Sequence, residues 1–162
     1  MSGLTQLVNW TSVTDSTNLR RLDRAGKLTF GEDGTVTAEN YPSGHQCYIR
    51  PFSASQLRSV GLLSPLPNQN WTREVRFFVE WESEEPPLKI ESMTQVWSDG
   101  AMHCYKPRNV YTAFWLNPLQ SITFHRFGVF DVATWDTLLA AWQAGALQRP
   151  WFNHATMPDP RG

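Results

Sequence analysis

The sequence is poor in cysteine: only Cys47 and Cys104 occur among its 162 residues. Two cysteines cannot cross-link a chain of this size into a disulfide framework, so free thiols in a reducing compartment are the expectation. The N-terminus, MSGLTQLVNWTSV, lacks a basic region followed by an apolar run, and no signal peptide is expected. We therefore predict a cytoplasmic, intracellular protein.

Long hydrophobic runs and an excess of one charge are also missing. No stretch reaches the roughly 18 apolar residues of a membrane-spanning helix. The net charge is −1, which gives no strong overall field toward nucleic acid or a membrane surface. The charge is uneven, because residues 71–100 contain seven acidic and three basic side chains. We predict neither nucleic acid nor a membrane as a partner.

The motifs of several common chemistries are absent as well. The sequence contains no Gly-x-Ser-x-Gly nucleophile elbow, no glycine-rich phosphate loop and no His-Glu-x-x-His zinc motif. It therefore predicts no catalytic residue, no metal site and no cofactor.

Aromatic residues are abundant, with eight tryptophans and nine phenylalanines. Such side chains fill a core or present flat faces to a partner. The length suits one self-sufficient core, so residues 1–162 are predicted to form a single domain. Residues 146–162 are predicted to form an extended C-terminal tail, in which Trp151 and Phe152 serve as anchors.

Alternation of apolar and polar residues predicts strands. The clearest case is REVRFFVEWE at residues 73–82, where every second side chain is apolar. Strand-like stretches joined by short turns follow at 88–97, 101–106, 110–116 and 120–127. Five such strands in a row predict an antiparallel meander.

Earlier in the chain, KLTFGEDGTVTAE at 27–39 predicts a hairpin around Glu32-Asp33-Gly34. Residues 45–50 predict a further strand, which Pro51 ends. Residues 52–70 are rich in Ser, Leu and Pro and remain ambiguous between a connection and a short element.

Two helices are predicted. A short N-terminal helix over residues 15–25 would begin at an Asp or Ser cap and end at Gly26. A C-terminal helix over 131–144 would begin at the Asp131 cap and end at Gly145. Its apolar stripe, spaced as on one helix face, should pack against the sheet.

The fold class that follows is mainly β. We expect an antiparallel β-sandwich or a small β-barrel of about eight strands, with the short N-terminal helix and with the C-terminal helix packed outside. The order of elements would also suit a lipocalin-like barrel.

Two similar stretches raise the question of a metal or thiol site. GHQCYIRP begins at Gly44 and AMHCYKP begins at Ala101, and each joins histidine and cysteine near a tyrosine and a proline. Zinc accepts such ligands, but neighbouring strand residues such as His103 and Cys104 point to opposite faces. We interpret both stretches as ordinary strands. Together with NWTSV at 9–13 and NWTREV at 70–75 they also leave open a weak internal repeat.

Glu80 and Glu82 offer a second possible chemistry. Residues two apart on a strand lie about 7 Å apart on one face, which is compatible with the paired carboxylates of an inverting glycosidase. Alternating glutamates are also typical of the solvated face of an antiparallel sheet, and we favour that interpretation.

The leading functional hypothesis is a non-enzymatic structural, assembly or protein-binding module that acts through aromatic surfaces, with a protein partner or as a homo-oligomer. The candidate binding residues are Trp97, Trp115, Tyr105, Trp151 and Phe152. The alternatives are a lipocalin-like barrel that binds a small apolar or aromatic ligand, and an enzyme based on carboxylates or on Cys and His.

Overall fold

The structure is a computed structural model that describes residues 6–8, 19–21, 27–31, 35–40, 47–50, 54–59, 61–65, 67, 70–109 and 111–146. The described residues form a mainly β structure with eleven strands, more than the eight or so expected, and two helices. Neither described helix has the length and apolar character needed to cross a membrane.

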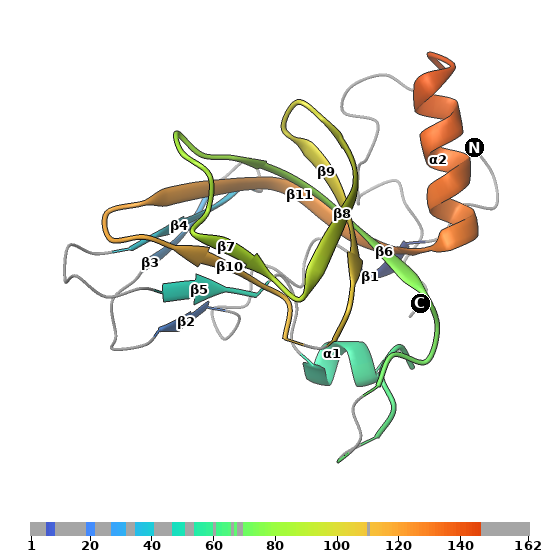
Figure 1. The fold of residues 1–162 in the computed structure, drawn as a ribbon, viewed down its shortest axis with the longest axis horizontal. Helices are drawn as coiled ribbons and strands as arrows, with labels where there is room; N and C mark the ends of the chain where they lie inside the picture. The colour runs from blue at the N-terminus through green and yellow to red at the C-terminus, as the bar shows by residue number, and fades with distance from the viewer. Residues whose placement is uncertain are drawn as a thin grey trace.

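All strand pairs are antiparallel, and they form two sheets (Figure 1). The large sheet has seven strands in the order β3-β4-β11-β6-β9-β8, with β1 paired to β11. Its strands are β1 (Gln6–Val8), β3 (Lys27–Phe30), β4 (Val36–Glu39), β6 (Val75–Glu82), β8 (Met93–Asp99), β9 (Met102–Pro107) and β11 (Ser121–Asp131).

The small sheet has four strands in the order β2-β5-β10-β7. They are β2 (Leu19–Arg21), β5 (Cys47–Ile49), β7 (Lys89–Glu91) and β10 (Ala113–Leu116). The path of each sheet has two ends, so the described strands form a sandwich-like pair of sheets and not a closed barrel. Of the two architectures expected from sequence, the sandwich is the one that fits.

The main core lies between the two sheets. Alternate residues of β6 (Val75, Phe77 and Val79) meet Phe114 of the small sheet there, all almost fully buried. This confirms the period-two interpretation of residues 73–82, because those side chains share one face of the strand. The hairpin expected at 27–39 is also confirmed, since Leu28 of β3 pairs with Ala38 of β4.

Helix α2 (Val132–Gln143) covers the other face of the large sheet. The Asp131 side chain accepts a hydrogen bond from the Thr134 backbone N–H at 2.7 Å, which caps the helix as predicted. Trp135 and Leu138 pack with Phe78 in a second apolar cluster. The C-terminal helix is therefore confirmed, and in Figure 1 it stands at the right, near the start of β6 and the end of β11.

The predicted N-terminal helix over 15–25 is wrong at its centre. Leu19–Arg21 form strand β2, which pairs with β5, so strand pairing in the folded chain outweighs a thin helical stripe. The short helix of the fold is α1 (Ala54–Ser59), within the stretch that the sequence left ambiguous. The predicted tail lies outside the described residues apart from Ala146.

The single strand expected at 88–97 is two strands in different sheets. Ser92 separates β7 from β8 with a positive φ of 61°, and its carbonyl accepts a hydrogen bond from the Arg108 N–H at 2.7 Å. Few residues other than glycine adopt this backbone region, so no local pattern indicated the break. The meander prediction is also wrong, because β6 lies between β9 and β11 and β10 belongs to the small sheet.

Candidate functional site

Aromatic side chains lie on the face of the small sheet that points away from the main core. On β10, Phe114 and Leu116 are buried, so the alternate residue Trp115 points outward. Tyr48 on β5 stands directly opposite Trp115, and their ring centroids are 4.6 Å apart. Such a tilted contact between two partly exposed rings forms the centre of the candidate site.

Basic side chains stack on these rings. The Lys89 ammonium lies 4.7 Å from the centroid of Trp115. The Arg50 guanidinium lies 5.3 Å from the ring of Tyr48 and 5.4 Å from that of Tyr111. These distances fall within the range of cation–π attraction. We call this set of five residues (Tyr48, Arg50, Lys89, Tyr111 and Trp115) the aromatic face.

The aromatic face is partly held in place by a hydrogen bond within the sheet. The Trp115 indole N–H donates to Glu91 Oε2 at 2.8 Å, which fixes the orientation of the ring. Tyr111 is exposed, with 53% of its surface accessible. Arg50 forms no ion pair with any residue that the structure describes, so no internal carboxylate neutralises its charge there.

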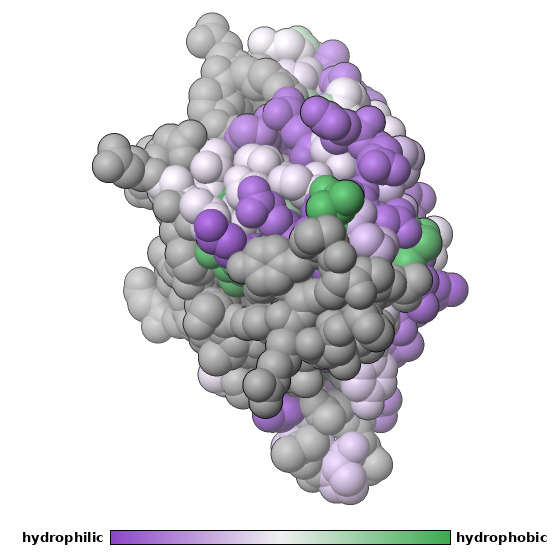
Figure 2. Space-filling model, turned by 90° about the vertical axis from the view of Figure 1, so that its left-hand side faces the viewer, coloured by the Kyte–Doolittle hydropathy of each residue, from purple (hydrophilic) through white to green (hydrophobic). Residues whose placement is uncertain are grey.

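The described surface includes a side that lacks a broad apolar area. Figure 2 shows one side of the molecule, where the described hydrophobic residues form separate patches among hydrophilic ones. An obligate interface would instead expose a continuous apolar area. On this side the described residues therefore do not form the continuous apolar area of an obligate interface.

The other predicted binding residues lie in different parts of the structure. Tyr105 is 1% exposed in the main core, and its hydroxyl accepts a hydrogen bond from the Trp81 indole N–H at 3.1 Å. Burial raises its pKa to about 12. Tyr105 therefore offers no surface to a partner, which corrects that prediction: its alternation places it inward.

Trp97 is only partly buried, but it packs edge-on against Trp135 at 5.5 Å and so belongs to the contact between α2 and the large sheet. Trp151 and Phe152 lie outside the described residues. Of the five candidates, Trp115 is the one that the structure places on an outward sheet face. The sequence analysis did not select Tyr48, Arg50, Lys89 or Tyr111 as site residues. The signal for Tyr48 was its position between the inward residues Cys47 and Ile49.

The two cysteines of the His-Cys stretches do not meet. Cys47 lies in the main core, whereas Cys104 lies in the cluster beneath α2, on the opposite side of the large sheet. His45, the histidine of the first stretch, lies outside the described residues. In the described ranges, no three His, Cys, Asp or Glu side chains gather in a way that could hold a metal ion.

His103 and Cys104 point to opposite faces of β9, as strand geometry predicts. His103 stacks on Trp81 at 4.6 Å, and burial lowers its pKa. The Cys104 thiol is fully buried, and burial raises its pKa well above the ordinary value. A thiolate nucleophile needs the reverse, so this pair is unsuited to Cys–His chemistry.

The carboxylate pair also differs from expectation. Glu80 is 8% exposed, whereas the sequence placed it in water with Glu82. Glu80 shares its face of β6 with Phe78, on which α2 packs, and the local pattern of β6 does not reveal that this face is covered. Glu82 is exposed and pairs with His125 at 3.1 Å.

Two clefts lie at opposite ends of β6. The basic cleft, of about 380 Å³, precedes the strand and is lined by Trp71, Arg73, Glu74, Lys106, Pro107 and Arg108. The acidic cleft, of about 470 Å³, follows the strand and is lined by Glu82, Ser83, Glu84, Glu85, Leu119 and Gln120. Both are at the rim of the fold, while large apolar side chains occupy the space between the sheets.

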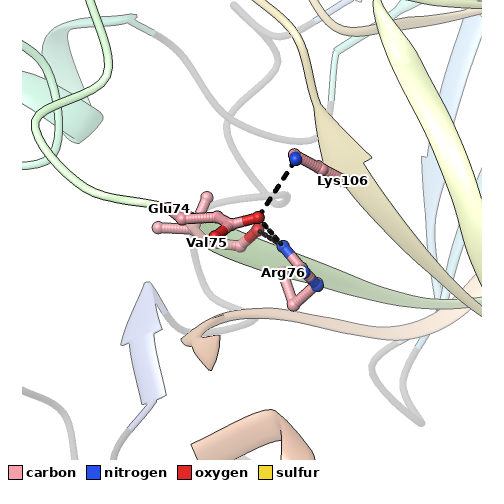
Figure 3. Close-up of polar contacts among 4 residues, drawn as sticks. All are labelled: Glu74, Val75, Arg76 and Lys106. Carbon is pink, nitrogen blue, oxygen red and sulfur yellow. Dashed lines mark hydrogen bonds and ion pairs between the residues drawn. The ribbon is translucent and has the colours of Figure 1, made fainter. Parts of the chain in front are cut away.

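Figure 3 shows the ion pairs of Glu74, one of the residues that line the basic cleft. Glu74 Oε1 lies 3.1 Å from the Lys106 ammonium and 3.2 Å from the Arg76 guanidinium. Hydrogen bonds from Lys106 and Arg76 lower the pKa of Glu74. Glu74 is solvent-exposed, so these contacts say more about what the cleft can bind than about stability.

Comparison of the chain with protein-family models, with curated proteins and with solved structures finds no match in any of the three. Function is therefore inferred from the aromatic face and the two clefts.

Proposed function

We propose that the chain is a non-enzymatic protein-binding module that binds its partner through the aromatic face. The observation that carries the proposal is the outward cluster of Tyr48 and Trp115 with Lys89 stacked above it. Tyrosine, tryptophan and arginine are the residues most enriched where protein interfaces gain their binding energy. The aromatic face brings all three together.

The charge of the face indicates the kind of partner. Lys89 and Arg50 are cationic, and Glu91 is the nearby anion that binds Trp115. An acidic group of a partner protein would pair with Arg50, while the rings would contact its apolar side chains. A nucleic-acid backbone has less support as the partner, because the net charge of −1 gives no overall positive field.

The small-ligand alternative has less support. A ligand-binding barrel needs an enclosed apolar cavity, whereas Phe77, Phe114 and Phe124 fill the space between the sheets. The enzyme alternatives also lose support from the burial of Glu80 and Cys104.

The proposal is tested by immobilising the chain and quantifying the proteins that it retains from a native extract. Tyr48→Ala with Trp115→Ala removes both central rings. Because loss of one interface anchor costs more than about 1 kcal/mol, the pair should reduce retention at least about tenfold. Val96→Ala is the control, since Val96 is 46% exposed on β8, in the other sheet. Equal retention by the double variant and the wild type would contradict the proposal.

A further inference from the structure

The basic cleft contains positively charged side chains that the described carboxylates do not neutralise. Glu74 is already shared between Lys106 and Arg76. Arg73 and Arg108 are exposed, and neither forms an ion pair within the ranges that the structure describes. Two such guanidinium groups around one cleft can each take a carboxylate in a paired, charge-assisted geometry.

The same cleft also offers apolar contact. Trp71 lines it and packs edge-on against Phe77 at 5.7 Å, and Pro107 lines it from β9. The matching ligand is therefore an acidic segment that carries an apolar side chain.

The acidic cleft at the other end of β6 has this composition. Glu84 and Glu85 are exposed, and neither is ion-paired to any described residue. Leu119 stands beside them with 72% of its surface accessible.

The backbone of the acidic cleft is firmly held. The Gln120 side-chain N–H group donates to the carbonyls of Glu85 at 3.0 Å and Pro86 at 2.9 Å. The Ser83 hydroxyl donates to the Ser121 carbonyl at 3.1 Å. Because these bonds order the loop in advance, its carboxylates can be presented to a partner with little loss of backbone entropy.

We propose that the basic cleft of one copy binds the acidic cleft of a second copy, so that chains associate head to tail. Arg73 and Arg108 would pair with Glu84 and Glu85 of the neighbouring copy, and its Leu119 would contact Trp71.

The placement of the clefts allows this association to continue. They flank the eight residues of β6, a separation of roughly 25 Å at 3.3 Å per residue. In Figure 1 the segment leading into β6 lies at the right and the turn after it lies at the left. A contact between unlike ends leaves one free end on each partner, so it forms rings or open chains.

This inference goes beyond the proposed function and uses no residue of the aromatic face. The contact is small and ionic, so association should be weak and should depend on salt. Sedimentation velocity at about 50 mM and at about 1 M salt tests the salt dependence of association. At 1 M salt the Debye length falls to about 3 Å, so ionic contacts between copies are screened. Concentrations up to about 1 mM reveal even a millimolar dissociation constant. We expect oligomers at low salt only. A wild-type chain that stays monomeric at low salt would overturn the proposal.

Two variants test the geometry. The basic-end variant carries Arg73→Ala and Arg108→Ala, and the acidic-end variant carries Glu84→Gln and Glu85→Gln. Each should be monomeric alone. An equal mixture should form dimers and nothing larger, because one intact basic cleft meets one intact acidic cleft. Association of either variant alone at the wild-type level, a mixture that stays monomeric, or a mixture that forms longer oligomers would each contradict head-to-tail pairing.

The matched control removes exposed charge elsewhere. Lys27→Ala on β3 with Asp136→Asn on α2 should associate as the wild type does. The Tyr48→Ala and Trp115→Ala chain should also associate normally, which separates failure of this inference from failure of the proposed function. Loss of association in either chain would overturn the assignment of the contact to the two clefts.

Discussion

Removing the Trp135 side chain tests the packing of α2 against the large sheet. Trp135 is 2% exposed and lies 6.1 Å from Phe78 and 5.5 Å from Trp97, measured between ring centroids. Buried tryptophan replaced by alanine costs about 3–5 kcal/mol, because contact area is lost and a cavity remains. For a chain of this size each kcal/mol lowers Tm by about 2–4 °C. Trp135→Ala should therefore lower Tm by roughly 6–20 °C.

The assay is thermal unfolding followed by circular dichroism, with urea unfolding as a second measure. Asp136→Ala is the control, because Asp136 is the exposed neighbour on α2, and surface changes usually stay within about 0.5 kcal/mol. A Tm loss below about 2 °C for Trp135→Ala would show that α2 does not cover the large sheet, since the expected cost would be absent.

Three further predictions concern single groups. Asp131→Ala should lower the free energy of unfolding by about 1 kcal/mol through loss of the Thr134 cap, and an unchanged urea midpoint would argue against the cap. A thiol reagent should label neither Cys47 nor Cys104 until the chain unfolds, because both are buried, and rapid labelling of the folded chain would contradict this. Burial lowers the pKa of His103, so the unfolded chain takes up its proton at a higher pH than the folded chain. This group's contribution to stability should be complete above the unfolded-state pKa of about 6.5 and should be lost as pH falls through the folded-state pKa. An NMR titration midpoint for the folded chain at or above that of the urea-unfolded chain would refute the burial of the ring.

Local patterns predicted the elements whose signal is local. The alternation at 73–82 identified β6, the turn residues at 32–34 identified the β3–β4 pair, and Asp131 identified the start of α2. Each of these depends on neighbouring residues, and the sequence shows those directly.

Features set by distant segments were not predictable in the same way. The left-handed backbone at Ser92 divides an apparently continuous strand between two sheets. Glu80 is 8% exposed, on the face of β6 where a helix more than fifty positions later packs on Phe78. Leu19–Arg21 become a strand because β5 is available to pair with them. Pairing and coverage across the chain decided all three outcomes.

In the candidate site, too, some features were predictable from local patterns and others were decided by distant segments. Trp115 was selected from sequence as a large aromatic residue on a strand with two apolar faces, and it lies on the aromatic face. Tyr105 was selected on similar grounds and is buried. Alternation shows which residues share a face, but which face turns inward depends on how the two sheets pack.

The aromatic face as a docking surface is tested most directly by photo-cross-linking in the native cells. Tyr111 is replaced by benzoylphenylalanine, and in a control chain Val96 is replaced instead. The two positions are similarly accessible, at 53% and 46%, but only Tyr111 belongs to the aromatic face. The account predicts a discrete protein adduct from position 111 and none of the same mass from position 96. Absence of an adduct at 111, or the same adduct from both positions, would contradict it.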